Sequence, residues 1–146
     1  ATEEAWLVDT RPQWDGLAAG VESAGRAAGG DEPTRPLPGI KQVSFLRRLP
    51  TLDHAGFVAA WERHAGLARR HHPVLWRYTQ NMVVRPLTPT TPELDGIADL
   101  TMRLRQDFVD RMYDSPEGRR IIGEDVRGFI DVPAGWRLHA REYRPR

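Results

Sequence analysis

The sequence predicts an α+β domain in which two helices cover one face of an antiparallel sheet of four strands. Three observations lead to this prediction. Some segments alternate apolar and polar residues as half-buried strands do, and others repeat apolar residues every three or four positions as helices do. The two kinds of segment follow one another as strand, helix, strand, strand, helix, strand, which is the split βαβ or ferredoxin-like order, βαββαβ.

Alternation is clearest in residues 40–47. Val43 and Phe45 fall on one side of this segment, and Gln42 and Ser44 fall on the other. The remaining predicted strands are residues 75–84, 97–104 and 136–143.

The first helix is predicted to begin at Asp53, whose side chain can cap first-turn amides, and to end before Pro73. Its apolar face carries Phe57, Trp61, His64, Ala65 and Ala68. A short helix is expected over residues 106–113. Another begins at Ser115, where a capping serine precedes a first-turn proline, and ends before Pro133.

Residues 1–38 differ from the rest of the chain. Ala5 to Val8 could form a short strand, for which Trp6 and Trp14 provide side chains to bury. Residues 17–38 are rich in alanine, glycine and proline and are expected to form a linker. The main domain is predicted to be residues 39–146. A chain of 146 residues provides one core of ordinary size.

Composition excludes several classes of function. The 21 basic and 20 acidic residues are interspersed, so no broad positive field favours nucleic acid. No apolar run is long enough to cross a bilayer, and we expect a cytoplasmic protein without membrane contact. The absence of cysteine excludes disulfides and thiolate chemistry. The abundance of arginine, alanine, glycine and proline is typical of a bacterial source with high GC content.

The predicted strands carry more bulky apolar side chains than one layer of helices needs. Trp76, Tyr78 and Ile97 are examples. We therefore expect the uncovered face of the sheet to pack against a second sheet, most simply in a homodimer.

His64 is the leading candidate for a catalytic residue because it is a titratable ring on the apolar face of a helix. A core histidine with a structural partner is the competing interpretation. Asp125, next to the buried side of the last helix, could hold the His64 ring in one tautomer, as a carboxylate does in a catalytic triad. Tyr78 could donate its phenolic proton to a developing oxyanion, or it could simply be a core tyrosine.

Five further residues are candidate ligand contacts. Phe45, Trp61 and Trp76 could form the walls of an aromatic-sized pocket, although such residues more often belong to the core. Asn81 is predicted to lie on the sheet face opposite Tyr78, because side chains alternate between the two faces along a strand. Asp95 could bind a polar ligand group or orient a histidine, but before Gly96 it is also a typical turn former.

A metal site is not expected. His64, His71 and His72 have a helical spacing, but Pro73 ends the helix there and no carboxylate completes a familiar ligand set.

Five sequence blocks resemble the EthD family of the dimeric α/β-barrel superfamily. They are FLRRLP, then Phe57, Trp61, His64 and Ala65, then HHPVLWRYTQN, LDGIADL and SPEGRRIIGEDVRGFID. The resemblance covers about residues 39–144. It implies a dimeric barrel of two facing sheets, with a ligand cleft between each sheet and its own helices.

The resemblance also implies functions. Relatives in the superfamily include polyketide cyclases, dehydratases and decarboxylases that need no cofactor, as well as oxygenases and haem proteins. We therefore expect a cofactor-independent enzyme, lyase-like or cyclase-like, in which His64 performs acid–base chemistry on a hydrophobic, oxygenated, polyketide-like molecule. The alternative is a non-catalytic small-molecule-binding or accessory module for an oxidoreductase, and haem binding is a third hypothesis.

The opening segment, residues 1–16, resembles the end of such a module. Larger family members carry two modules in tandem, so this segment is expected to be either the last strand of a first module or an arm that adds a strand to a partner's sheet. The partner of the domain is accordingly a second copy of the chain or a tandem module.

Overall fold

The computed structural model describes residues 3–16 and 36–143. The predicted linker, residues 17–38, lies almost entirely outside these residues. The elements in chain order are β1 (Trp6–Asp15), β2 (Ile40–Leu46), α2 (His54–His71), β3 (Arg77–Pro86), β4 (Gly96–Met102), α3 (Asp107–Asp110), α4 (Pro116–Arg127), a 3-10 turn (Val132–Ala134) and β5 (Trp136–Ala140).

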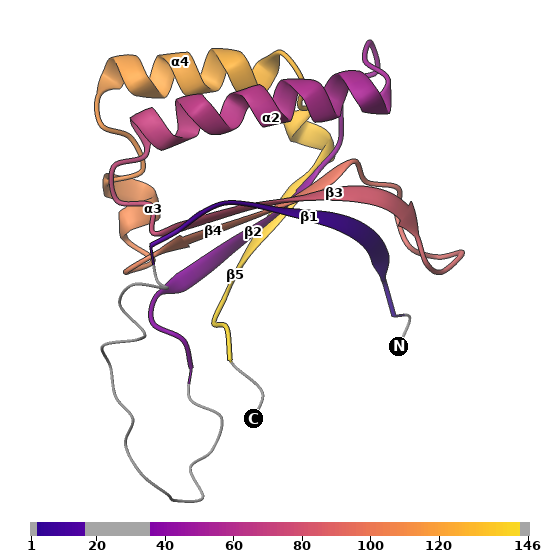
Figure 1. Ribbon diagram of the computed structural model, residues 1–146, viewed down its shortest axis with the longest axis horizontal. Coiled ribbons are helices and arrows are strands. Elements are labelled where there is room, and N and C mark those ends of the chain that lie inside the picture. The colour runs from indigo at the N-terminus through magenta and orange to yellow at the C-terminus, as the bar shows by residue number, and fades with distance from the viewer. Residues whose placement is uncertain (1–2, 17–35, 144–146) are drawn as a thin grey trace, which may run out of the picture.

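One antiparallel sheet with the strand order β1-β3-β4-β2-β5 forms the base of the described structure (Figure 1). Strands β2 to β5 with α2 and α4 keep the predicted ferredoxin-like order. The predicted count of four strands is wrong, because β1 adds a fifth strand to the β3 edge of its own chain. Pairing runs from Trp6 opposite Pro86 to Asp15 opposite Arg77, and it satisfies backbone groups that an edge strand would leave open.

The two long helices begin where their capping residues predict. The Asp53 carboxylate accepts a hydrogen bond from the Gly56 N–H at 2.7 Å, and the Ser115 hydroxyl accepts one from the Gly118 N–H at 2.9 Å. The short helix α3 has only four residues, fewer than predicted. Val109, which lies in this helix, is 74% exposed.

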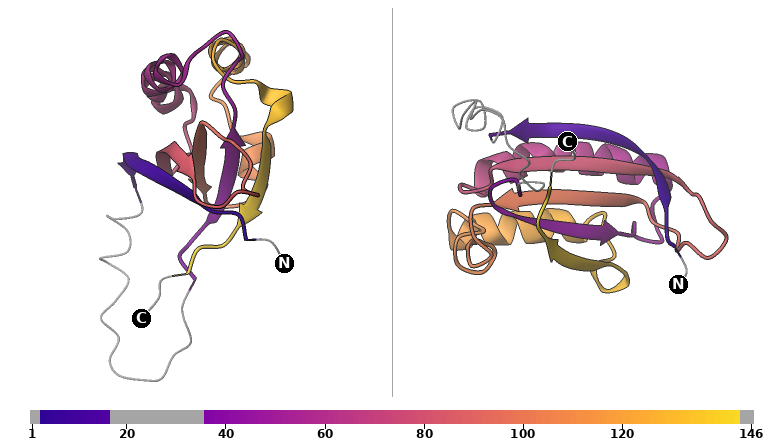
Figure 2. Two further views of the ribbon diagram at one scale, coloured as in Figure 1. Left: turned by 90° about the vertical axis from the view of Figure 1, so that its right-hand side faces the viewer. Right: turned by 90° about the horizontal axis from the view of Figure 1, so that it is seen from below.

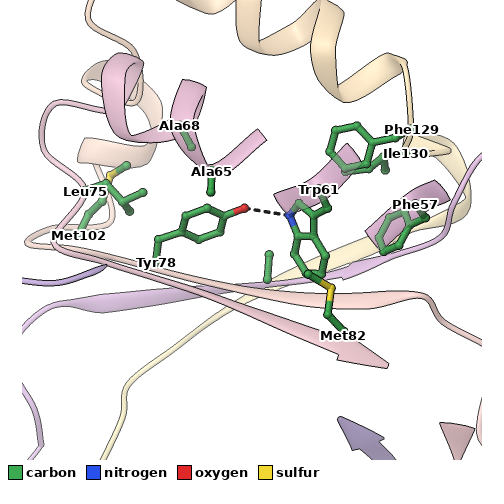
Figure 3. Packing of buried hydrophobic residues seen from close by; sticks show 11 residues of the cluster. Phe57, Trp61, Ala65, Ala68, Leu75, Tyr78, Met82, Met102, Phe129 and Ile130 are labelled. Atoms are coloured by element: carbon green, nitrogen blue, oxygen red, sulfur yellow. Dashed lines mark hydrogen bonds between the residues drawn. The ribbon is translucent and has the colours of Figure 1, made fainter. Parts of the chain in front are cut away.

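Helices α2 and α4 lie side by side on one face of the sheet (Figures 1 and 2). The core fills the space between these helices and the sheet (Figure 3), and its largest fully buried side chains include Phe57, Trp61 and Phe129. Gly96 on β4 allows Trp61 to lie directly against the sheet, since a Cβ at Gly96 would overlap the indole ring.

The other face of the sheet is covered by neither helix (Figure 2). Register places Phe45 on this face together with Val43, because Ser44 pairs with Ala98 on the helix side. The Phe45 ring stacks on Trp136 with centroids 4.9 Å apart and lies 5.8 Å from the Trp6 ring. Within the described residues, no helix is both long enough and apolar enough to span a bilayer.

Candidate functional site

A cavity of about 300 Å³ lies among α2, α4, the segment after α3 and the helix-facing side of the sheet. This volume is at the lower end of the range for small-molecule sites. Most of the wall is apolar. Its aliphatic part includes Leu46, Ala68, Ala98, Leu100, Met112, Ile122, Val126, Ile130 and Val132. Three buried residues that can exchange hydrogen bonds with a ligand also line it, namely His64, His72 and Tyr78.

His64 comes from α2, and α4 supplies its partner. The His64 Nδ1 lies 2.7 Å from the Asp125 Oδ2. A carboxylate only accepts hydrogen bonds, so Nδ1 carries the proton and Nε2 of the neutral ring has a free lone pair. Burial lowers the pKa of His64 below its ordinary value, and the hydrogen bond that the ring donates to Asp125 only partly opposes this effect. His64 is therefore a neutral base near pH 7.

Tyr78 is held by two donors. Its hydroxyl oxygen accepts from the Trp61 Nε1–H at 2.8 Å (Figure 3) and from the Gln80 Nε2–H at 3.1 Å. The same Gln80 nitrogen donates to the Trp61 carbonyl oxygen at 2.7 Å, which fixes the orientation of the amide. Both contacts use the hydroxyl oxygen as an acceptor, so the Tyr78 proton is free to point at a third group. Burial raises the pKa of Tyr78 to about 12, so the hydroxyl stays protonated near neutral pH.

His72 is a third polar group of the cavity and one that the sequence considered only as a metal ligand. It caps the C-terminus of α2 and is 6% exposed. Its Nδ1 lies 2.6 Å from the Met112 carbonyl oxygen, which requires a proton on Nδ1 and leaves Nε2 as an acceptor. Burial lowers the pKa of His72 as well, so this ring is also neutral.

The part of the chain that holds this site matches a known protein family. The family model described as EthD domain matches residues 49–133, more than half of the chain. The chain belongs to the EthD family. No curated protein matches it.

The matched span of the EthD protein includes α2, β3, β4, α3 and α4. It therefore contains His64, Tyr78 and Asp125, the three residues that the sequence proposed as catalytic. The structure brings His64 and Asp125 into direct contact and places Tyr78 on the wall of the same cavity.

Of the predicted aromatic walls, only Trp61 has its ring within the core beside the cavity. Phe45 contributes atoms to the cavity lining, but its side chain lies on the sheet face away from the helices. Trp76 precedes β3, lies near Gly39 and is absent from the cavity wall. The predicted strand over residues 75–84 begins two residues later in the structure, which removes Trp76 from the alternation with Tyr78.

Asn81 and Asp95 make contacts elsewhere in the EthD protein. Asn81 accepts from the Thr10 hydroxyl at 2.8 Å on the sheet face opposite Tyr78, as the alternation predicts. Asp95 accepts from the Arg48 N–H at 2.9 Å and lies 3.1 Å from the His54 Nδ1, so it braces the end of β2 against the start of α2. Neither residue lines the cavity.

In the described part of the chain, no three His, Cys, Asp or Glu side chains are arranged to hold a metal ion. His71, the neighbour of His72, instead pairs with Asp114, its Nδ1 lying 3.1 Å from the Asp114 Oδ2.

Proposed function

We propose that this EthD protein is an acid–base enzyme that acts on a hydrophobic, oxygen-bearing small molecule. One observation carries the proposal: an apolar cavity is lined by both a neutral imidazole held by a carboxylate and a buried phenol with a free proton. These are the groups that enolisation of a ketone requires, a base for the C–H proton and a donor for the oxygen.

In the proposed reaction, the His64 Nε2 removes a proton from the carbon next to a ketone carbonyl. The C–H electron pair becomes the C=C bond of an enolate, and the negative charge moves to the carbonyl oxygen. Tyr78 donates a hydrogen bond to that oxygen, and Asp125 stabilises the imidazolium. Return of the proton to carbon gives exchange or isomerisation. Attack of the enolate within the molecule gives cyclisation.

The same groups support dehydration and decarboxylation. Loss of a β-hydroxyl needs an enolate and a proton donor, which the imidazolium of His64 supplies. Loss of carbon dioxide from a β-keto acid passes through the same enolate, which the Tyr78 donor stabilises. In each of these reactions the chain's own residues are the acid, the base and the oxyanion donor, so we propose that the chemistry is cofactor-independent.

The proposal is tested with 2-tetralone, a hydrophobic bicyclic ketone with acidic C–H groups. Exchange of its C1 protons in D2O is followed by NMR with and without the protein. The protein is expected to accelerate exchange well above the buffer rate. Exchange at the buffer rate, with 2-tetralone shown to be bound, would contradict the proposal.

Tyr78→Phe is expected to slow this exchange by about 10²-fold at saturating ketone, because one oxyanion donor is lost. It also leaves the Trp61 and Gln80 donors without an acceptor, so the folded fraction is checked by circular dichroism. Tyr143→Phe, at an exposed position, is the matched control and should leave the rate unchanged. An unchanged rate in folded Tyr78→Phe would remove Tyr78 from the reaction.

A non-catalytic binding or accessory module is the second candidate. The apolar character of the cavity favours it, since such a wall retains a hydrophobic ligand without any chemistry. This candidate predicts that binding survives loss of His64 and that the ligand is recovered unchanged.

We also propose that the uncovered face of the sheet packs against a second sheet, in a homodimer or from a tandem module. Phe45, Trp136 and Leu138 give this face an apolar surface. Light scattering on the purified chain is expected to give a dimer, and Trp136→Glu is expected to give a monomer. Val109→Glu, exposed on α3, should remain dimeric. A wild-type monomer would contradict the homodimer.

A further inference from the structure

The second histidine of the cavity has no role in the proposed reaction. The His72 ring is buried, lines the same cavity as His64, and uses its Nδ1–H on the Met112 carbonyl. No described residue makes a hydrogen bond to its Nε2. Since His72 lies on the cavity wall, a ligand or water in the cavity can supply the donor that Nε2 lacks.

Position along α2 separates the two imidazoles. His72 follows His64 by eight residues, which at 1.5 Å per residue is about 12 Å along a helix. Both rings line one cavity, and the distance between their backbone positions allows them to contact different parts of one bound molecule. The Tyr78 hydroxyl is hydrogen-bonded to the ring of Trp61, which precedes His64 by one turn of α2, and Tyr78 lines the same cavity.

The surroundings of His72 favour a flat molecule. Its ring lies against Tyr113 with centroids 5.3 Å apart, and Met112, whose carbonyl it contacts, lines the cavity too. A neutral Nε2 accepts a hydrogen bond and repels a carbonyl or ether oxygen, so a hydroxyl or an N–H donor satisfies it, and of these a hydroxyl fits the oxygen-bearing molecule of the proposed function.

We propose that His72 selects substrates that carry a hydroxyl at the end remote from the reacting carbonyl. The substrate class is then a hydroxylated fused-ring ketone, whose carbonyl lies between His64 and Tyr78 and whose distal hydroxyl donates to the His72 Nε2. This inference rests on the proposed function for the position of the carbonyl end. The preference for a distal hydroxyl is a property of binding, which is measured without turnover.

The test compares 2-tetralone with 6-hydroxy-2-tetralone, whose hydroxyl is on the ring far from the carbonyl. Dissociation constants are measured by calorimetry on the full chain. The hydroxylated ketone is expected to bind about tenfold more tightly to the wild type, the effect of one good hydrogen bond to a buried group. 6-Methoxy-2-tetralone cannot donate and is expected to show no such gain.

His72→Asn is the informative variant. The asparagine amide can still donate to the Met112 carbonyl, but it lacks the atom that corresponds to Nε2. It is expected to reduce the tenfold preference to less than threefold, and the ratio of the two dissociation constants is compared so that any general change in the cavity wall cancels. A purely structural His72 would instead change the affinity for both ketones by the same factor and keep the preference. His71→Asn, whose ring pairs with Asp114, is the matched control and should keep the preference.

The outcomes separate the two proposals. If His72→Asn keeps the preference, or if the wild type binds the methoxy ketone as tightly as the hydroxy ketone, the inference is overturned whatever the catalytic result. If the preference depends on His72 but no proton exchange occurs, the substrate class stands as a ligand class and the proposed enzyme activity fails. If none of the three ketones binds, both are overturned.

Discussion

His64→Asn is expected to reduce the rate of 2-tetralone proton exchange by about 10² to 10⁴-fold, the usual contribution of a positioned general base. Asparagine can keep a donor for the Asp125 carboxylate in place of the Nδ1–H, but it removes the Nε2 lone pair. The loss should therefore appear in the rate at saturating ketone, with binding of the ketone largely retained. Single-turnover NMR measurements on the folded variant give this rate directly.

The control is His71→Asn, on the same helix but outside the cavity wall, which should exchange 2-tetralone within about twofold of the wild type. A His64→Asn rate within about threefold of the wild type would show that His64 is not the base. Binding of 2-tetralone to the wild type without exchange above the buffer rate would instead favour the accessory-module alternative.

Phe57→Ala is expected to lower the free energy of unfolding by about 3–5 kcal/mol, the usual cost of removing a large buried aromatic side chain. The Phe57 ring is 0% exposed and lies between the Trp61 and Phe129 rings, with centroid distances of 5.5 and 5.9 Å. Loss of the ring leaves a cavity that the sheet and two helices cannot close. Urea denaturation followed by tryptophan fluorescence measures the change.

Val109→Ala is the comparison for this prediction. Val109 is 74% exposed on α3, so its truncation should change the free energy of unfolding by less than about 0.5 kcal/mol. A Phe57→Ala loss of less than about 1 kcal/mol would contradict the described packing of α2 on the sheet.

The sequence predicts the helices and the ferredoxin-like order because their signals are local. A capping Asp53 and the three-to-four spacing from Phe57 to Ala68 lie within one segment, and so does the Ser115 cap of α4. Strand β1 extends much further than the predicted residues 5–8, and its partner β3 is distant along the chain. The sequence of a strand does not say which other strand it pairs with, because any sheet edge with open backbone groups can pair with it.

Alternation along a strand separates two faces but does not say which one the helices cover. The alternation correctly places Phe45 and Ser44 on opposite faces of the sheet. Only the pairing of β2 with β4 shows that the face with Ser44 is the one the helices cover. The roles of His72 and Gln80 were missed for a similar reason. Their partners, the Met112 carbonyl and the Tyr78 hydroxyl, are tertiary contacts without a sequence spacing of their own. A buried-side histidine and a carboxylate beside a buried helix face were sufficient to suggest the His64 and Asp125 pair.

The central claim is that His64 is a neutral base near pH 7, held by Asp125 with its Nε2 free. Burial lowers the pKa of His64 below 6.5, so the base form persists to lower pH than in an exposed histidine. Protonation is therefore less favourable in the folded protein than in the unfolded chain. The folded protein therefore loses stability relative to the unfolded chain as the pH falls below about 6.5, the pKa of His64 in the unfolded chain.

The most direct test is an NMR titration of the His64 ring nitrogens in the wild type and in Asp125→Asn. The wild type should show the Nδ1–H tautomer at neutral pH and a pKa below 6.5. The pKa should fall further in Asp125→Asn, because the carboxylate that favours the charged ring is gone. A pKa above 6.5, or an Nε2–H tautomer in the wild type, would contradict the proposed base.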